Sequence, residues 1–178
     1  MRLWNGWGNE DSDLTMELSS GLSMLLEALV GTGTALPQAT LNDVISKVPN
    51  TRLENHPLII TDPETRVRHS RGQSLPDWLE MHSGNVDTFP DGVAFPESSE
   101  QVRELLAHAK ENNLVVIPYG GGTSVVGHIN PENTDKPILT IDMGKMNTMM
   151  SIDTTSQLAT FGAGTPGPIV EEELKKHG

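Results

Sequence analysis

Apolar side chains recur at helical spacing in two stretches of the first fifty residues. Four leucines fall on one face of a helix predicted over residues 21–30, which Gly31 ends. A second helix is predicted to begin at Thr40, where Asp43 completes a capping box, and to end at Pro49. The chain is therefore predicted to open with a helical layer. The apolar positions of the two helices are Leu22, Leu25, Leu26 and Leu29 in the first, and Leu41, Val44, Ile45 and Val48 in the second.

From residue 91 onward the pattern changes to short apolar runs around one helix. Residues 93–95 and 114–117 predict two buried strands, ending at Pro96 and Pro118 because proline has no N–H to give a sheet. Ser98 caps the helix between them, with Gln101 at the reciprocal position. This βαβ order predicts that the loop after the second strand lies at the carboxyl edge of a parallel sheet, where ligands bind.

The last forty residues add strands of a different kind. They are predicted to form a third strand, a hairpin that a glycine turn closes, and a final helix, and the methionines Met146, Met149 and Met150 are expected to fill core gaps. The predicted fold class is α+β or α/β. Residues 1–90 form a helical and irregular extension, and residues 91–178 form a small βαβ sheet followed by antiparallel strands. The late elements are predicted over residues 138–142, 151–153 with 157–161, 162–164 and 169–177.

Residues 50–90 give a weaker pattern. Residues 58–60 could form a short strand between Pro57 and Pro63. Residues 66–78 carry a cluster of cations in an otherwise acidic chain. The cluster could neutralise an anionic ligand, but a solvated charge run over a packed Trp78 is the favoured interpretation.

The stretch of residues 117–128 carries the candidate chemistry. Gly120, Gly121 and Gly122 are followed by Thr123 and Ser124, and successive N–H groups in such a turn can converge on a phosphate. A P-loop is excluded because His128 and Ile129 stand where Lys and Ser/Thr are required. A Rossmann fingerprint is excluded because Val125 replaces its third glycine. A flexible surface turn is the remaining alternative.

Charge and composition limit the partners. The net charge of the 178-residue chain is −12, which argues against nucleic acid or an anionic membrane as partner. No Lys or Arg lies between Val115 and Asn133, so a phosphate at the loop would depend on backbone donors. Cysteine is absent, which excludes thiol chemistry and suits a cytoplasmic location. No apolar run is long enough to span a membrane, and no metal ligands are assigned.

Several of these stretches together resemble the amino-terminal half of a PCMH-type FAD-binding domain. The resemblance rests on residues 91–102, 117–125 and 158–164, and residues 4–8 and 71–75 extend it to the FAD-linked transferase branch, the alkyldihydroxyacetonephosphate synthase family. It covers nearly the whole chain and is strongest from Arg66 onward. Members of this family are much longer, so the chain is expected to be a truncated piece of such a domain.

The resemblance implies a set of cofactor-binding residues. In covalent members of the wider superfamily a histidine stands where this chain has Thr123, so the resemblance implies noncovalent FAD. His128 is displaced from that position and is expected to be structural. Gly162, Ala163 and Gly164 match a turn that approaches the dinucleotide. The residues that match the segment binding the FAD pyrophosphate are Tyr119, Gly120, Gly121, Gly122, Thr123, Ser124 and Val125, with Gly127 beside them.

The activity that the resemblance implies is exchange of the acyl chain of acyl-dihydroxyacetone phosphate for a long-chain alcohol, giving an ether lipid precursor. The family's catalytic groups fall beyond this chain, so no catalytic residue is assigned and the lipid substrate is expected to bind elsewhere in the parent, which could be peripheral to a membrane. A fragment of an FAD-dependent 2-hydroxy-acid dehydrogenase and a non-enzymatic domain are the alternatives. Alone, the chain is expected to be inactive and to bind FAD weakly. Because its sheet edges are unpaired, it is also expected either to self-associate, as a homo-oligomer, or to expose a hydrophobic patch along its last strands.

Overall fold

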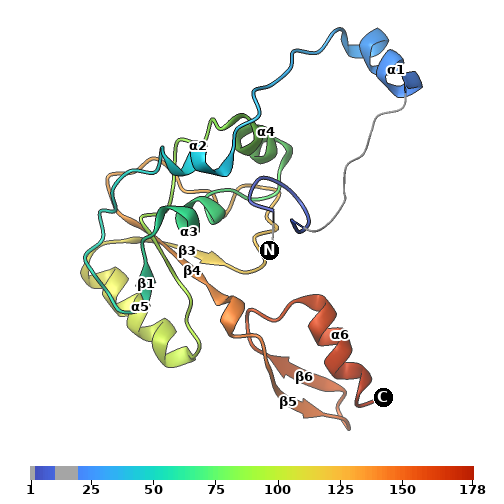
Figure 1. Ribbon diagram of the computed structural model, residues 1–178. Helices are drawn as coiled ribbons and strands as arrows, with labels where there is room; N and C mark the ends of the chain where they lie inside the picture. The colour runs from blue at the N-terminus through green and yellow to red at the C-terminus, as the bar shows by residue number, and fades with distance from the viewer. Residues whose placement is uncertain (1–2, 11–19) are drawn as a thin grey trace.

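A four-stranded mixed sheet forms the centre of the computed structural model, which describes residues 3–10 and 20–178. Its strand order is β1-β2-β4-β3 (Figure 1). The strands β2 (Gly92–Ala94), β4 (Ile138–Asp142) and β3 (Val115–Tyr119) are parallel, and β1 (Ile59–Ile60) is antiparallel to β2. The predicted strands of the βαβ unit are thus present, but β4 lies between β2 and β3.

The helix α5 (Ser99–Glu111) connects β2 to β3 and buries Leu105 and Ala109. The Ser98 hydroxyl accepts a hydrogen bond from the Gln101 amide at 3.3 Å, as a cap should. The Gln101 side chain, however, accepts from the amide of Glu97 at 2.6 Å, one residue before the predicted position. The cap is confirmed, with its reciprocal bond shifted by one residue.

Pro118 does not end its strand, contrary to the prediction. The parallel register runs through Pro118 opposite Ile141 to Tyr119 opposite Asp142. The reason is that β3 is at the edge of the described sheet, and an edge strand tolerates a residue without an N–H. Tyr119 therefore belongs to the sheet, and the glycine loop begins one residue later.

Much of the first ninety residues packs against this sheet. The helices α2 (Leu41–Ile45), α3 (Pro63–Arg68) and α4 (Leu75–Ser83) surround one apolar cluster, while β1 joins the cluster that α5 covers. The predicted capping box of Thr40 and Asp43 is present. The division of the chain at residue 91 stays a prediction. The first cluster contains Val44, Val67, Met81, Val86 and Phe89, and the second Ile59, Ala94, Leu105, Leu139 and Ile141.

The predicted solvated charge run over residues 66–78 is wrong. Arg66 and Arg71 are 2% and 6% exposed, because folding turns them toward carbonyl groups of the chain. Arg66 donates to the carbonyl oxygens of Pro90 at 2.6 Å and Pro49 at 2.7 Å, and burial lowers its pKa below the ordinary arginine value. Arg71 donates to Glu80 and to two carbonyl groups. These cations stabilise the fold and are not a solvated surface.

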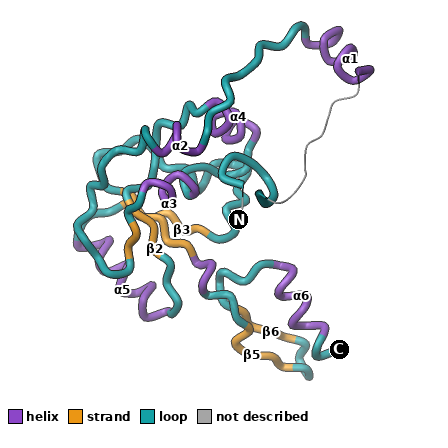
Figure 2. The backbone as a smooth tube through the Cα atoms, viewed as in Figure 1, coloured by secondary structure: helices purple, strands orange, loops and turns teal. Residues whose placement is uncertain are grey.

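The first helix forms where it is predicted but is not packed. α1 (Ser20–Val30) ends at Gly31, yet none of its residues is buried. It projects away from the rest of the molecule (Figures 1 and 2). Its apolar residues, among them Leu25 at 53% and Leu29 at 71%, are exposed. The spacing of apolar residues predicts this helix correctly, but it does not show what the helix packs against.

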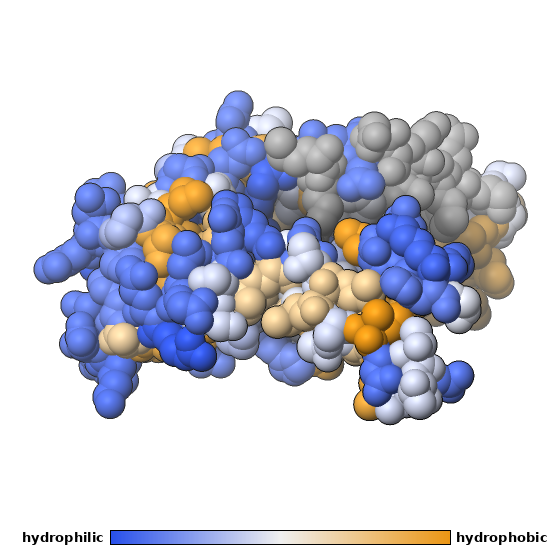
Figure 3. Space-filling model, turned by 90° about the horizontal axis from the view of Figure 1, so that it is seen from below, coloured by the Kyte–Doolittle hydropathy of each residue, from blue (hydrophilic) through white to orange (hydrophobic). Residues whose placement is uncertain are grey.

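The chain ends in a separate hairpin and helix. The strands β5 (Met149–Asp153) and β6 (Leu158–Phe161) pair antiparallel, as predicted, and α6 (Gly167–Lys175) follows. The 3-10 helix η1 (Met143–Lys145) joins β4 to this unit. Met150 is 68% exposed, so it fills no core gap. On the face shown in Figure 3, hydrophobic residues gather in small groups on a largely hydrophilic surface.

Candidate functional site

The glycine loop leaves the carboxyl end of β3, as the sequence predicts. Tyr119, the last residue of the strand, is 3% exposed and its ring lies 4.6 Å from that of His69. Gly122 has φ of +66°, a conformation that glycine adopts without strain and that turns the chain sharply. The turn leaves Gly120, Gly121 and Thr123 exposed.

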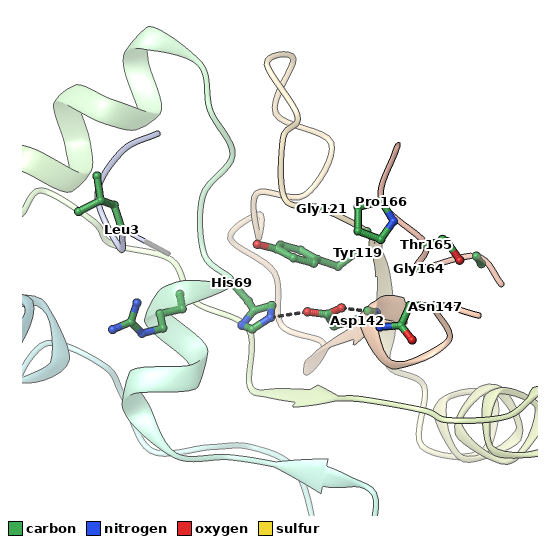
Figure 4. A pocket seen from close by; sticks show the side chains of 13 residues that line it. Leu3, His69, Tyr119, Gly121, Asp142, Asn147, Gly164, Thr165 and Pro166 are labelled. Atoms are coloured by element: carbon green, nitrogen blue, oxygen red, sulfur yellow. Dashed lines mark hydrogen bonds and ion pairs between the residues drawn. The ribbon is translucent and has the colours of Figure 1, made fainter. Parts of the chain in front are cut away.

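A cavity of about 410 Å³ lies beside this loop. Its walls come from four places in the sequence: Leu3 near the amino terminus, the end of α3, the end of β3 with the first two glycines, and the segment from β4 to the turn before α6. Figure 4 shows His69, Tyr119 and Asp142 pointing toward one another, with Thr165 and Pro166 across from them. The lining residues are Leu3, Arg68, His69, Tyr119, Gly120, Gly121, Asp142, Gly144, Asn147, Ala163, Gly164, Thr165 and Pro166.

The glycines around the cavity serve two purposes. At Gly120 an added Cβ would meet no atom within 4 Å, so the backbone there lies open to a guest in the cavity. At Gly164 an added Cβ would instead collide with the carbonyl oxygen of Met143. Gly164 therefore lets the turn after β6 lie directly against Met143, the residue after β4, and Ala163 and Gly164 line the cavity.

His69 and Asp142 form a buried pair in the cavity wall. Nε2 of His69 lies 3.0 Å from Oδ2 of Asp142, and Nδ1 lies 2.7 Å from the carbonyl oxygen of Thr65. A carbonyl oxygen only accepts, so Nδ1 carries a proton. Nε2 then faces the Asp142 carboxylate, so the two hydrogen bonds fix the orientation of the His69 ring in the cavity wall.

Arg68 brings a cation to the same cavity. Its guanidinium also pairs with Glu64 at 2.9 Å and with Glu10 at 3.3 Å. The glycine loop contains no cation of its own, so Arg68 is the group through which the fold supplies one. Of the cations in residues 66–78, Arg68 lines the cavity, whereas Arg66 and Arg71 donate to other parts of the chain. A role for the cluster in binding an anionic ligand stays a prediction.

A smaller cavity of about 220 Å³ lies on the other side of the loop. Gly121 and Thr123 line it together with Gln73 and the segment of residues 6–9, which includes Trp7. Gly121 lines both cavities. The backbone of the loop at Gly121 is therefore accessible from both cavities.

The remaining predicted residues lie away from the main cavity. The carbonyl oxygen of Ser124 accepts from the Gln73 amide at 2.6 Å, and its hydroxyl accepts from the His128 amide at 3.3 Å. Val125 is 65% exposed and Gly127 faces a third cavity beside β3. Gly122 is buried at the turn. The structure thus brings Tyr119, Gly120 and Gly121 to the cavity, and gives Ser124 a role in holding the loop.

Sequence reasoning left several cavity residues unassigned. Asp142 carried a usable signal, because it ends a buried strand at the same edge as the glycine loop. His69, Thr165 and Pro166 carried none, since only the folded chain brings α3 and the turn before α6 to this edge. Within residues 3–10 and 20–178, no group of His, Asp and Glu could hold a metal ion, and no helix has the length and apolarity to cross a membrane.

These features fit a dinucleotide cofactor. A pyrophosphate needs backbone that it can approach closely, and the open backbone at Gly120 offers it. It also needs charge compensation, which Arg68 can supply. The cavity is open and partly apolar, as a site for a ring system requires.

Comparisons with known proteins agree with this geometry. Residues 90–178 match the family described as FAD binding domain. The alkyldihydroxyacetonephosphate synthase of Trypanosoma brucei brucei is 35% identical over 119 residues, which cover 66% of this chain and 19% of that protein. The synthase of Dictyostelium discoideum is 36% identical over 117 residues, with the same coverage. A mitochondrial D-lactate dehydrogenase (cytochrome) of Saccharomyces cerevisiae is 31% identical over 102 residues, 57% of this chain and 17% of that protein.

Solved structures give the same result. Two structures of an alkyldihydroxyacetonephosphate synthase superpose with TM-scores of 0.81 and 0.82 at 26% and 27% identity, covering 99% of this chain. The chain spans 39% and 38% of those structures and about a fifth of the length of the two synthases named above. The α/β fold and the resemblance found in the motifs are confirmed.

Proposed function

Because this chain belongs to the FAD binding domain family, we propose that its glycine loop holds the pyrophosphate of FAD. The observation that carries the proposal is the open backbone of Gly120 in the wall of the cavity, which Gly121 also lines. The proposed binding residues are those of the sequence prediction: Tyr119, Gly120, Gly121, Gly122, Thr123, Ser124 and Val125, with Gly127 beside them. To these we add Arg68, His69 and the turn of residues 163–166.

Each cavity residue has a proposed part in this site. The amides of the loop donate to the pyrophosphate, and Arg68 compensates its charge. Tyr119 and the His69–Asp142 pair form a polar floor, because His69 contacts both Tyr119 and Asp142. FAD, when bound, supplies its redox-active ring system, and the residues described here supply its position and its electrostatic surroundings.

We further propose that FAD binds without a covalent link. Thr123 cannot form the histidyl bond of covalent relatives in the wider superfamily. His69, the histidine in the cavity wall, has both ring nitrogens within hydrogen-bond distance of oxygen atoms. Neither nitrogen is therefore available to a flavin without loss of a buried hydrogen bond.

For the full-length protein we propose the alkyl-for-acyl exchange on acyl-dihydroxyacetone phosphate that the synthase resemblance implies. The similarity to two alkyldihydroxyacetonephosphate synthases supports it. The dehydrogenase similarity supports an FAD-dependent 2-hydroxy-acid dehydrogenase as second candidate. Product formation from acyl-dihydroxyacetone phosphate and a long-chain alcohol, against reduction of an artificial acceptor by D-lactate or glycolate, separates the two. A cytoplasmic location and self-association stay predictions.

Gly121→Val tests the cofactor site. The new side chain would enter the space where the loop backbone meets both cavities, so we expect purified full-length protein to lose its FAD. Flavin is measured in the supernatant after acid precipitation, which releases noncovalent cofactor. Gly33→Val is the matched control, because Gly33 lies outside the site and has no atom within 4 Å of an added Cβ. Stoichiometric flavin in Gly121→Val would contradict the proposed site, and flavin that stays with the precipitate would contradict noncovalent binding.

A further inference from the structure

The segment between α3 and α4 contacts the glycine loop through its backbone. The amide of Gln73 donates to the carbonyl oxygen of Ser124 at 2.6 Å, and the amide of Gly72 donates to Oδ1 of Asn130 at 3.0 Å. No side chain fits at position 72, because a Cβ on Gly72 would collide with the Ser124 carbonyl oxygen. Residues 72–73 therefore lie directly against the loop.

Asp77 links this contact to the helix α4. Its Oδ2 accepts from the amide and hydroxyl of Ser74, at 3.0 and 2.7 Å, in the capping box that begins α4. Its Oδ1 accepts from Nδ2 of Asn130 at 2.6 Å. Asp77 is 3% exposed. One buried carboxylate thus ties the start of a helix to the end of the glycine loop.

The loop also closes on itself next to this anchor. The amide of Asn130 donates to the carbonyl oxygen of Gly127 at 3.0 Å, and the amide of His128 donates to the Ser124 hydroxyl. Ser124 and Asn130 are therefore both turn-forming residues and attachment points to residues 72–77. Between them and β3 lie the glycines, which have no side chains to hold them in place.

We propose that Asp77 and Asn130 are positioning residues that hold the glycine loop in the conformation its anionic ligand requires. The proposal rests on the proposed function for the identity of that ligand. Glycines lose more conformational freedom on ordering than other residues, so a loop ordered before binding gives higher affinity. A short hydrogen bond to a buried carboxylate is a strong anchor for this purpose. Neither residue lines the main cavity or the small one on the far side of the loop.

Asp77→Asn removes one of the two functions of this carboxylate. The amide oxygen can still accept from Ser74, but the amide nitrogen then faces Nδ2 of Asn130, and two donors cannot bond. Asn130→Asp instead places two carboxylates against each other. We expect each single variant of the full-length protein to bind FAD roughly tenfold more weakly in a fluorescence titration, the effect of one lost charged hydrogen bond.

Exchanging the carboxylate of residue 77 and the amide of residue 130 tests directly whether the hydrogen bond between them positions the loop. In the double variant D77N/N130D, the amide at 77 accepts from Ser74 and donates to the carboxylate at 130, which also accepts from the Gly72 amide. We expect its FAD affinity to return to within about threefold of wild type, which would give a large coupling between the two sites. Failure of the exchange to restore affinity, with wild-type thermal stability, would overturn the proposal.

The chain offers a matched control. Thr40 and Asp43 form the same capping box on α2, and Asp43 has no bond to the loop. Asp43→Asn should leave FAD affinity unchanged, whatever it does to thermal stability. Equal loss of affinity in D43N and D77N would mean that any weakened cap has this effect and would overturn a positioning role for Asp77.

Hydrogen exchange separates this proposal from the proposed function. Without FAD, the amides of His128 and Asn130 should exchange about tenfold faster in D77N than in wild type, because their turn loses its anchor, and the double variant should restore protection. This result would support the positioning role even if wild-type protein bound no FAD, an outcome that would contradict only the proposed function. Unchanged exchange in D77N would overturn the positioning role even if FAD bound tightly.

Discussion

Asp91 shows how one residue joins the early part of the chain to the sheet. Its carboxylate accepts from the guanidinium of Arg52 at 2.7 and 2.9 Å, and from the amide of Ile138 at 2.7 Å. Burial of Asp91 is the largest single effect on its pKa and raises it. The hydrogen bonds from Arg52 and from the Ile138 amide together outweigh burial, and the pKa lies below the ordinary aspartate value.

Asp91→Asn should therefore destabilise the protein in a pH-dependent way. At pH 7 we expect a loss of about 1–3 kcal/mol in the free energy of unfolding, because buried donors lose a charged acceptor. A depressed carboxyl pKa stabilises the fold above the unfolded-state value of about 3.9, and this contribution disappears as the pH falls through the folded-state pKa. The difference between wild type and variant should shrink below about pH 4.

Chemical denaturation of the 178-residue chain at several pH values measures this difference. Asp87→Asn serves as control, because Asp87 also pairs with an arginine but its side chain is 87% exposed. It should change the unfolding free energy by less than about 0.5 kcal/mol at pH 7. If the difference in unfolding free energy between wild type and Asp91→Asn were the same at pH 3 as at pH 7, the ionic role of Asp91 would be contradicted.

At the same scale, the sequence predicts the loop better than its surroundings. Glycines and hydroxyl residues after a strand are a local signal, and Tyr119, Gly120 and Gly121 do line the cavity. His69 reaches it only because the end of α3 brings the His69 ring against the Tyr119 ring, a contact between residues fifty positions apart. Such distant contacts leave no periodic pattern in the sequence. The sequence therefore predicts the residues of the loop but not the residues at the end of α3 that line the same cavity.

Among the elements, α1 has the least support from the rest of the fold. All of its residues are exposed, although its apolar face would suit a packed helix. The double variant L25E/L29E should therefore leave the unfolding free energy of the 178-residue chain within about 0.5 kcal/mol of wild type. Urea denaturation followed by circular dichroism gives this value.

The comparison for this result is a substitution in α5, the helix that connects the parallel strands β2 and β3. Leu105 of α5 is fully buried, and Leu105→Ala should cost about 2–5 kcal/mol. Loss of comparable size in L25E/L29E would show that the apolar face of α1 is covered in the chain in solution, contrary to the structure.

The sequence predicts the ends of helices correctly where a capping residue or a glycine marks them. The caps at Thr40 and Ser98 and the glycine at 31 predict helix boundaries because they satisfy backbone groups within a few residues. The prediction missed α3 and α4 because each buries a charged residue, Arg66 in α3 and Asp77 in α4, so neither helix gives an apolar period. It also ended β3 too early at Pro118, because whether a strand lies at an edge is a property of the whole sheet.

At the scale of the whole molecule, the segment that leaves the sheet after β4 and the turn after β6 meet at two close backbone contacts. Gly164 lies against Met143, and Gly162 lies against Met146. The main cavity is walled on one side by β3 and α3 and on the other by the turn that Gly164 belongs to. The spacing between these two segments therefore decides the width of the cavity.

Gly164→Ala should widen this contact, because the new methyl group would collide with the Met143 backbone. We expect full-length protein to bind FAD roughly tenfold more weakly, while the core clusters and the near-ultraviolet circular dichroism of their aromatic residues stay unchanged. Gly167→Ala is the control, since an added Cβ there meets no atom within 4 Å and alanine favours the helix. Wild-type affinity in Gly164→Ala would mean that the two segments do not jointly hold the cofactor.

Pro118 has a consequence for how copies of this chain behave together. An open strand edge is a template on which another chain can add a strand, and such additions can propagate into aggregates. β3 forms one edge of the described sheet, and Pro118 is its last residue but one. Proline has no N–H with which to bond an incoming strand. The same proline that misleads a strand prediction thus disfavours the addition of another chain at this end of the edge.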